Sequence, residues 1–165
     1  MQPLIGLVLA VIIAYLAYRA RSLNRSGAIA ATVVGTVVFG FGGLQWAVLL
    51  MIFFVTSSGL SRAFKKRKQK LDEKFSKGHE RDAGQVFGNG GLATAFVLLH
   101  AIWPESIVGW AGFAAALAAV NADTWATELG VLNPTPPRML TDLGKRVEKG
   151  TSGGISLSGT LASLT

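Results

Sequence analysis

The chain has no cysteine and only two histidines among its 165 residues. The lack of cysteine excludes disulfides, a thiolate nucleophile and a cysteine-ligated metal. His79 and His100 are isolated, which argues against a zinc site. Charge is scarce as well, because Asp, Glu, Lys and Arg make up 15% of the chain, whereas soluble domains average about 25%. This composition is not that of an ordinary soluble domain.

The hydrophobic residues that fill the chain instead gather into long blocks. They make up half of it, the mean hydropathy is +0.44, and there are 20 glycines. Apolar blocks of about 20 residues are typical of transmembrane helices, so the sequence predicts an all-α, polytopic integral membrane protein. The arginines near the first block follow it and do not precede it, which indicates a span and not a signal peptide. We expect about five spans and the start of a sixth, at about 3–18, 28–41, 45–60, 90–103, from 107 into the polar stretch at 121, and at 155–165.

The basic residues indicate how these spans are oriented. All 16 Lys and Arg fall within 19–25, 62–81 and 138–149, that is, after the first, third and fifth spans. The links Gly42-Gly43 and Pro104-Glu105 on the opposite side contain no basic residue. By the positive-inside rule, the basic loops are cytoplasmic and the N-terminus is outside. We therefore expect a single transmembrane domain over 1–165, with cytoplasmic loops at about 19–27, 61–88 and 130–153, and a net charge of +7 that reflects topology and not nucleic-acid binding.

Two carboxylates, Asp123 and Glu128, follow the uncharged apolar run 107–120. An acid at the end of such a run loses hydration and is normally retained only when it is paired, metal-bound or reactive. The alternative is that both acids merely mark the point where the helix leaves the bilayer. On one helix they are offset by about 140°, so both cannot face one ion directly. Glu128 would lie on one stripe of the helix with Asn121 and with either Thr124 or Trp125. Asp123 and Thr127 would form an adjacent i, i+4 pair. Their hard oxygens suit Mg²⁺ that is also bound by substrate phosphates.

A glycine- and hydroxyl-rich stretch, Lys149 to Thr160, follows the last basic loop. Glycines allow close backbone approach, and successive amides at a helix start can hold an anion. This is not a Walker A sequence, because the lysine precedes the glycines. A flexible loop that enters a small-residue helix is the alternative interpretation. We expect phosphate binding by Lys149, Gly150, Thr151, Ser152, Gly153, Gly154 and Ser158.

Polar groups also lie at the mouth of the fourth span. Arg81-Asp82 is followed by Gln85 and by Asn89, which we expect to cap the fourth helix. His79 is expected to be a solvated loop residue, and His100 to lie at the membrane interface. Small residues suit close helix packing in lipid, and we expect four glycines to leave room for a lipid tail. These glycines are Gly35, Gly40, Gly109 and Gly112.

Taken together, the ordered motifs resemble the DUF92 integral membrane family. They are the stretch from Arg81-Asp82 to Gly91, the stretch from Asn121 to Gly130, Pro137-Arg138, and the stretch from Gly150 to Thr160. The family includes the human transmembrane protein 19 type and plant phytyl phosphate kinases, and the resemblance covers about residues 27–165. Family members are longer, with further helices after the last motif. We therefore expect this chain either to be truncated or to lack those helices.

The resemblance implies transfer of the γ-phosphate of CTP or another nucleotide to a prenyl (phytyl, farnesyl or geranylgeranyl) monophosphate. Phosphoryl transfer needs positioning and charge neutralisation more than covalent catalysis. We expect Asp123 and Glu128 to bind Mg²⁺ and to act in catalysis with Arg81 and Asp82. Nucleotide or phosphate contacts are expected from Asn89, Asn121, Thr124, Arg138 and the 149–158 stretch, with Lys145 as a further cation.

Three other interpretations remain open at this point. A CTP-dependent lipid cytidylyltransferase would use the same groups but release pyrophosphate. A transporter would need an acid deep within the helical bundle, whereas the polar motifs here cluster on one face. A non-catalytic scaffold is the third. The expected partners are the lipid, the nucleotide and the bilayer of the cell (plasma or inner) membrane, with the active face cytoplasmic and a homo-oligomer as an open alternative.

Overall fold

The computed structural model describes residues 2–64 and 80–164. Five helical segments among these residues are long and apolar enough to cross a membrane, which confirms the expected number of spans. They are α1 (Gln2–Arg19), α2 (Arg25–Val37) continued by the π-helical turn η1 (Val38–Gly42), α3 (Leu44–Ala63), α5 (Ala83–Ile102) and α6 (Ile107–Gly130).

The described residues divide into two compact units. The first unit contains residues 2–55 and 80–119, and the second unit contains 56–64 and 120–164. Helices α3 and α6 contribute residues to both units, since each passes from one to the other along its length.

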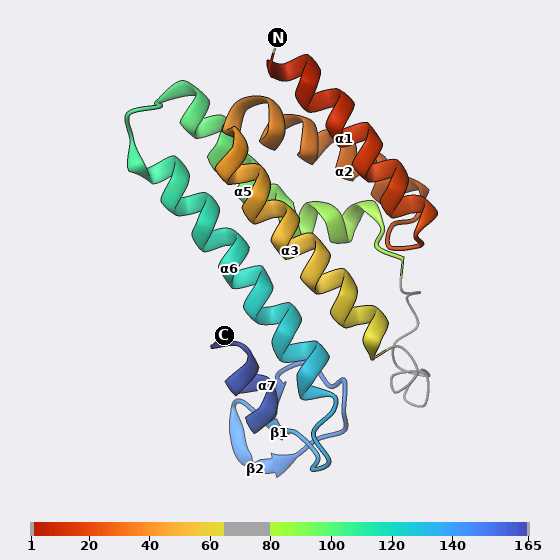
Figure 1. Ribbon diagram of the computed structural model, residues 1–165. Coiled ribbons are helices and arrows are strands. Elements are labelled where there is room, and N and C mark those ends of the chain that lie inside the picture. The colour runs from red at the N-terminus through yellow and green to blue at the C-terminus, as the bar shows by residue number, and fades with distance from the viewer. Residues whose placement is uncertain (1, 65–79, 165) are drawn as a thin grey trace. The chain divides into compact units, whose positions relative to one another are not determined.

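In the first unit, α1 lies alongside α2 and η1 (Figure 1). Small residues make the contact close. A Cβ added to Gly6 would lie 2.6 Å from the backbone nitrogen of Gly40, and one added to Gly35 would lie 2.9 Å from the Cβ of Ala10. The hydrophobic effect does not drive helices together in lipid, because the lipid tails are as apolar as the side chains. Van der Waals contact at such close approach is therefore a main source of helix association in membranes. The expectation of tight packing around Gly35 and Gly40 is confirmed.

The starts of α2 and α5 are joined in the same unit. Asn24 caps α2, and its side chain accepts a hydrogen bond of 2.9 Å from the amide of Gly27. The backbone of Arg81 pairs with the α1–α2 turn, donating to the carbonyl of Ser22 (3.0 Å) and accepting from the amide of Asn24 (3.1 Å). The turn after α1 and the residue Arg81 before α5 therefore meet in this unit.

An aromatic cluster joins α3, α5 and α6 in the first unit. The ring of Trp46 lies 4.9 Å from His100, 5.2 Å from Trp110 and 4.8 Å from Phe113, measured between centroids. His100, expected at the interface, is thus packed among aromatic rings. A Cβ on Gly109 would lie 2.6 Å from the Cβ of His100, so this glycine allows the helices to pack closely.

The expectation that four glycines leave room for a lipid tail is wrong for three of them. The space beside Gly109 is filled by His100, that beside Gly112 by the Phe96 ring, and that beside Gly40 by Pro3. When helices pack closely at a glycine, atoms of the neighbouring helix occupy the space that a larger side chain would have filled. Gly35 is a different case, because Ala10 fills the space where its side chain would lie, but the residue also lines an apolar pocket of the first unit.

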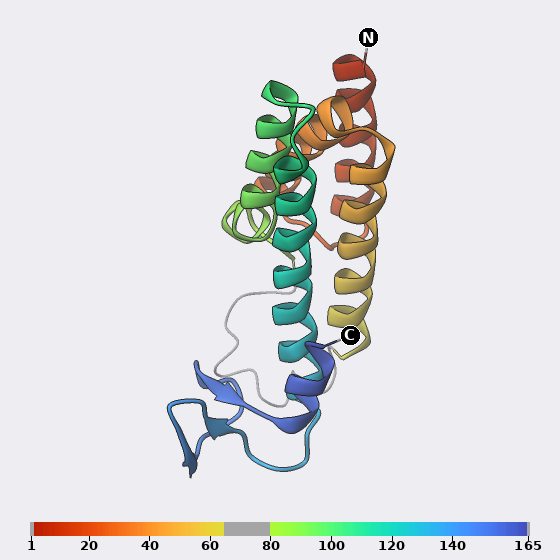
Figure 2. The ribbon, with the colours of Figure 1, turned by 90° about the vertical axis from the view of Figure 1, so that its left-hand side faces the viewer.

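The second unit contains the last turns of α6, a small sheet and a short helix, α7 (Leu157–Ala162), which lies against the end of α6 (Figure 2). The three strands have the order β2-β1-β3, and both pairings are antiparallel. The sequence did not predict this sheet within the expected loop 130–153. The strands are β1 (Arg138–Met139), β2 (Asp142–Arg146) and β3 (Gly154–Ile155).

Candidate functional site

The cleft-lining face of α6 carries Asp123. Asp123, Thr127 and Gly130 follow one another at spacings of four and three residues, which places them on one side of a helix. All three line a cleft of about 490 Å³ in the second unit, and the side chain of Asp123 is exposed. The helix remains α-helical through this stretch, so Asp123 and Thr127 lie on one face of it, as helical spacing predicts.

The opposite wall of the cleft is the loop Lys149–Gly154. Gly150 and Gly153 have φ angles of 84° and 76°, in the left-handed region that favours glycine. The loop closes through two turns, with the Thr151 amide donating to the Glu148 carbonyl (3.1 Å) and the Gly154 amide donating to the Thr151 carbonyl (3.0 Å). All six residues of the loop line the cleft. A residue of ordinary conformation followed by a left-handed one is a backbone pattern of anion-binding nests, and the loop contains it at Lys149-Gly150 and Ser152-Gly153.

The third wall is the start of α7. Ser156 caps this helix and accepts a hydrogen bond of 3.2 Å from the amide of Gly159. Gly159 allows the close contact with α6, since a Cβ there would lie 2.8 Å from the carbonyl of Ala126. Ser156 and Gly159 both line the cleft, whereas Ser158 is outside its lining and lies 3.4 Å from the Ser156 hydroxyl.

Two of the three cations predicted near this loop, Lys149 and Arg138, each donate to a backbone carbonyl. Lys149 is half-buried, and its Nζ donates to the carbonyl of Val131 at 3.0 Å, which ties the loop to the end of α6. Arg138 is exposed, and its Nη1 donates to the carbonyl of Leu143 at 2.6 Å. Of the two, Lys149 lines the cleft.

Glu128 lies on another face of α6. It is 7% exposed, and its Oε1 accepts a hydrogen bond of 2.8 Å from the hydroxyl of Ser61 on α3. The same stripe contains the buried Oδ1 of Asn121 and the buried Nε1 of Trp125, neither of which has a hydrogen-bond partner among the described residues. This stripe is the one predicted from helical spacing. Glu128, Asn121 and Thr124 are not among the residues that line the cleft.

Asp123 therefore lines the cleft and Glu128 does not. Within residues 2–64 and 80–164, no group of three His, Cys, Asp or Glu side chains could hold a metal. Mg²⁺ does not require such a group, because it commonly binds one or two carboxylates together with water and substrate phosphates. The Asp123 carboxylate and the hydroxyls of Thr151 and Ser152 are hard oxygen donors that fit this mode. Glu128, turned toward Ser61, gains no support as a second ligand of the same ion.

The predicted residues Arg81, Asp82 and Asn89 belong to the first unit. Asp82 begins α5 through a capping box, in which its side chain accepts from the Gln85 amide (2.8 Å) and the Gln85 side chain accepts from the Asp82 amide (3.0 Å). The prediction that Asn89 caps this helix is wrong, since α5 begins at Ala83 and Asn89 lies within it. The Asp82-x-x-Gln85 pattern already contained this signal.

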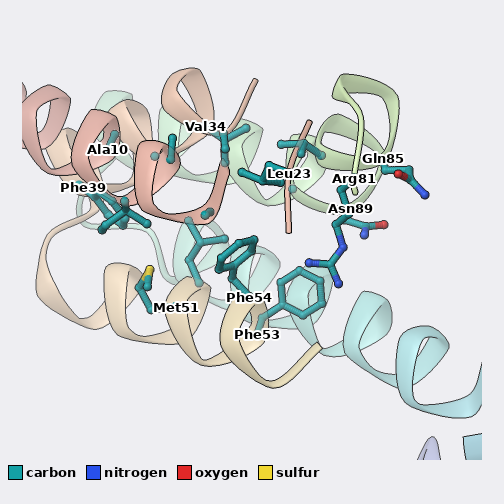
Figure 3. A pocket seen from close by; sticks show the side chains of 18 residues that line it. Ala10, Leu23, Val34, Phe39, Met51, Phe53, Phe54, Arg81, Gln85 and Asn89 are labelled. Carbon is teal, nitrogen blue, oxygen red and sulfur yellow. The ribbon is translucent and has the colours of Figure 1, made fainter. Parts of the chain in front are cut away.

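Asn89 instead lines a second, smaller pocket, of about 80 Å³, together with Arg81 and Gln85 (Figure 3). The guanidinium carbon of Arg81 lies 5.8 Å from the centre of the Phe54 ring, within the range of a cation–π contact. His79 lies outside the described residues.

The spans and the two pockets define a polytopic membrane protein with a polar cleft beside its last long helix. Residues 8–165 match the family described as integral membrane protein DUF92, and the chain belongs to that family. It is 35% identical over 184 residues to Protein PGR of Arabidopsis thaliana, covering 99% of this chain and 62% of that protein. It is 33% identical over 172 residues to an uncharacterized membrane protein of Methanocaldococcus jannaschii, covering 98% and 67% respectively.

A membrane protein of Synechocystis, also described as uncharacterized, is 27% identical over 134 residues, covering 80% of this chain and 52% of that protein. The chain thus spans about half to two thirds of the length of these relatives. No solved structure matches it.

Proposed function

We propose that the chain carries the nucleotide-binding part of a Mg²⁺-dependent kinase, which transfers the γ-phosphate of CTP or another nucleoside triphosphate to a prenyl monophosphate. The observation that carries the proposal is the cleft of the second unit. It joins the exposed carboxylate of Asp123 to a loop with two left-handed glycines, two hydroxyls and Lys149. Its volume of about 490 Å³ lies within the roughly 300–1,000 Å³ usual for ligand pockets.

In this proposal the loop Lys149–Gly154 holds the phosphates of the nucleotide. The backbone amides of Gly150, Ser152 and Gly153 and the hydroxyls of Thr151 and Ser152 would donate hydrogen bonds to phosphate oxygens. Lys149 fixes the loop against α6 through the Val131 carbonyl, so that these donors are positioned before the nucleotide binds. Pre-positioned donors avoid the cost of reorganisation during the reaction.

Asp123 would hold Mg²⁺ at the side of the cleft that faces the loop. When bound, the ion neutralises charge on the β- and γ-phosphates, which lowers the repulsion between two anionic substrates. An oxygen of the prenyl phosphate then attacks the γ-phosphorus, the bond to the β-phosphate oxygen breaks, and the nucleoside diphosphate leaves with that electron pair. No proton acceptor is needed, because the attacking phosphate oxygen is already ionised at neutral pH.

The location of the proposed reaction follows from charge. The basic loops predict that the side bearing residues 138–149 is cytoplasmic, where nucleoside triphosphates are available. On this basis the nucleotide cleft would lie on the cytoplasmic face, and the cell membrane as its location stays a prediction.

The test is phosphoryl transfer by the purified protein in lipid nanodiscs, with Mg²⁺, γ-labelled CTP or ATP, and prenyl monophosphates of several lengths. We expect a labelled prenyl diphosphate from the wild type and a loss of at least about 100-fold in Asp123→Asn. Asp142→Asn is the matched control, because this exposed carboxylate lies on β2, where it accepts a hydrogen bond of 3.0 Å from the Gly144 amide.

Full activity of a folded Asp123→Asn protein would remove Asp123 from the mechanism. Label that appears in lipid only from α-labelled CTP, with release of pyrophosphate, would indicate a cytidylyltransferase and overturn the kinase proposal. Prenyl phosphate that crosses the membrane of reconstituted vesicles without any labelled product would indicate transport.

A further inference from the structure

The pocket of the first unit differs in character from the cleft. It has a volume of about 80 Å³ and is lined by residues of α1, α2, η1, α3 and α5. Almost all of its lining is apolar, with small residues such as Ala14, Ala31 and Gly35 beside larger ones such as Val34 and Phe53. Apolar linings hold water poorly and accept apolar ligands.

Polar side chains gather at one end of this pocket. Figure 3 shows Arg81, Gln85 and Asn89 at one end and Ala10, Phe39 and Met51 at the other. The pocket therefore has the two-part character of an amphiphile, with a cation and two amides at one end and hydrocarbon at the other.

The backbone fixes Arg81 at this position. Its amide donates to the carbonyl of Ser22 and its carbonyl accepts from the amide of Asn24, so the residue is held on both sides. The guanidinium group lies over Phe54 at the polar end. A guanidinium presents a planar set of donors that matches phosphate oxygens, and no backbone rearrangement is needed to present it there.

We infer that this pocket binds the part of the hydrocarbon chain next to the phosphate in an anionic single-chain lipid, with the phosphate of that lipid at Arg81. The identity of the lipid as the prenyl monophosphate acceptor rests on the proposed function. A water-sized probe needs roughly 10–15 Å³, so the pocket holds about five to eight carbon-sized groups, or about one isoprene unit. A longer chain continues into the surrounding lipid.

The test measures binding without turnover, with geranyl monophosphate and geraniol as probes and no nucleotide present. Both carry the same hydrocarbon chain, so their difference isolates the phosphate. The full chain is purified in detergent, and a geranyl monophosphate with a diazirine on the isoprene unit next to its phosphate is crosslinked and mapped by mass spectrometry. We expect label on pocket residues such as Val34, Met51 and Phe53, and competition by unlabelled geranyl monophosphate but not by inorganic phosphate.

Two variants separate the contributions of tail and head. Ala31→Leu places three more carbons in the pocket and should weaken both probes at least about tenfold. Ala95→Leu is its matched control, because Ala95 is exposed on α5 and outside the pocket lining. Arg81→Gln should weaken geranyl monophosphate about 10- to 100-fold and leave geraniol unchanged, and Arg81→Lys should retain part of the difference.

Label confined to residues outside the pocket would overturn the inference, as would unchanged binding in a folded Ala31→Leu protein. Wild-type mapping keeps the first result available even if Ala31→Leu does not fold. Pocket binding without phosphoryl transfer would support this inference and count against the proposed function. Phosphoryl transfer with label mapped elsewhere would do the reverse.

Discussion

Replacement of Gly27 by alanine is expected to lower the free energy of unfolding, because there is no room for a side chain at this position. Gly27 lies in the first turn of α2, directly against the backbone of Arg81. A Cβ at this position would clash with the carbonyl oxygen of Arg81 and would lie 3.0 Å from its carbonyl carbon. Real Cβ atoms do not come this close to backbone, so in Gly27→Ala the Arg81 segment must move away.

The size of the effect depends on the contacts that this movement breaks. Two backbone hydrogen bonds hold the segment, to Ser22 (3.0 Å) and Asn24 (3.1 Å), and each is worth about 1 kcal/mol. Overpacking adds about 1–3 kcal/mol, and the better helix propensity of alanine returns about 1 kcal/mol. The net loss of stability is about 2–4 kcal/mol.

The assay is a reversible unfolding titration of the purified protein in detergent micelles, followed by circular dichroism. Gly88→Ala is the matched control, because Gly88 is helical, exposed and has nothing within 4 Å of the added Cβ. It should raise stability by about 0.5–1 kcal/mol. Equal shifts in Gly27→Ala and Gly88→Ala would refute the reasoning, since they would mean that Arg81 does not pack against α2.

Three further results are expected. Ser61→Ala removes the hydroxyl that donates to the buried Glu128 and should lower the free energy of unfolding by about 1–3 kcal/mol in the same titration. If the double variant with Glu128→Gln is no more stable than Ser61→Ala alone, the hydrogen bond is not the cause of the loss. Asp82→Ala should cost about 0.5–2 kcal/mol through loss of the α5 cap, whereas Asp82→Asn should keep stability; if Asp82→Asn is stable but inactive in phosphoryl transfer, Asp82 has a chemical role beyond capping. Gly153→Ala, at φ 76°, should cost about 1–2 kcal/mol and should weaken nucleotide binding measured by equilibrium dialysis, and unchanged binding would remove the loop backbone from the phosphate site.

Much of the membrane architecture could be predicted because it depends on local composition. An uncharged run long enough to span lipid must become a helix, since backbone groups find no other partners there. The helix α6 shows the same logic at the level of side chains. Its regular spacing alone predicted that Asp123 and Thr127 share one face and Glu128 another.

The errors lie where contacts between distant segments decide the outcome. Gly109 and Gly112 suggested free space, but space depends on whichever side chain faces it, here His100 and Phe96. The short sheet was missed because its strands of two to five residues carry little periodic signal and are held by pairing across the loop. The partner of Glu128, Ser61, lies 67 residues away in sequence, and no local pattern links the two.

The contact between α6 and α7 has a consequence for how the cleft can change over time. Gly130 and Gly159 meet with almost no side chain between them, and both lie in the wall of the cleft. A single substitution at Gly130 or Gly159 cannot change the shape of this wall alone, because any added carbon would push the two helices apart. If the cleft is the proposed nucleotide site, changes in what it accepts must therefore come from other lining positions, such as Thr127, Val131 and Thr160, where a different side chain alters the cleft and leaves the contact between α6 and α7 in place.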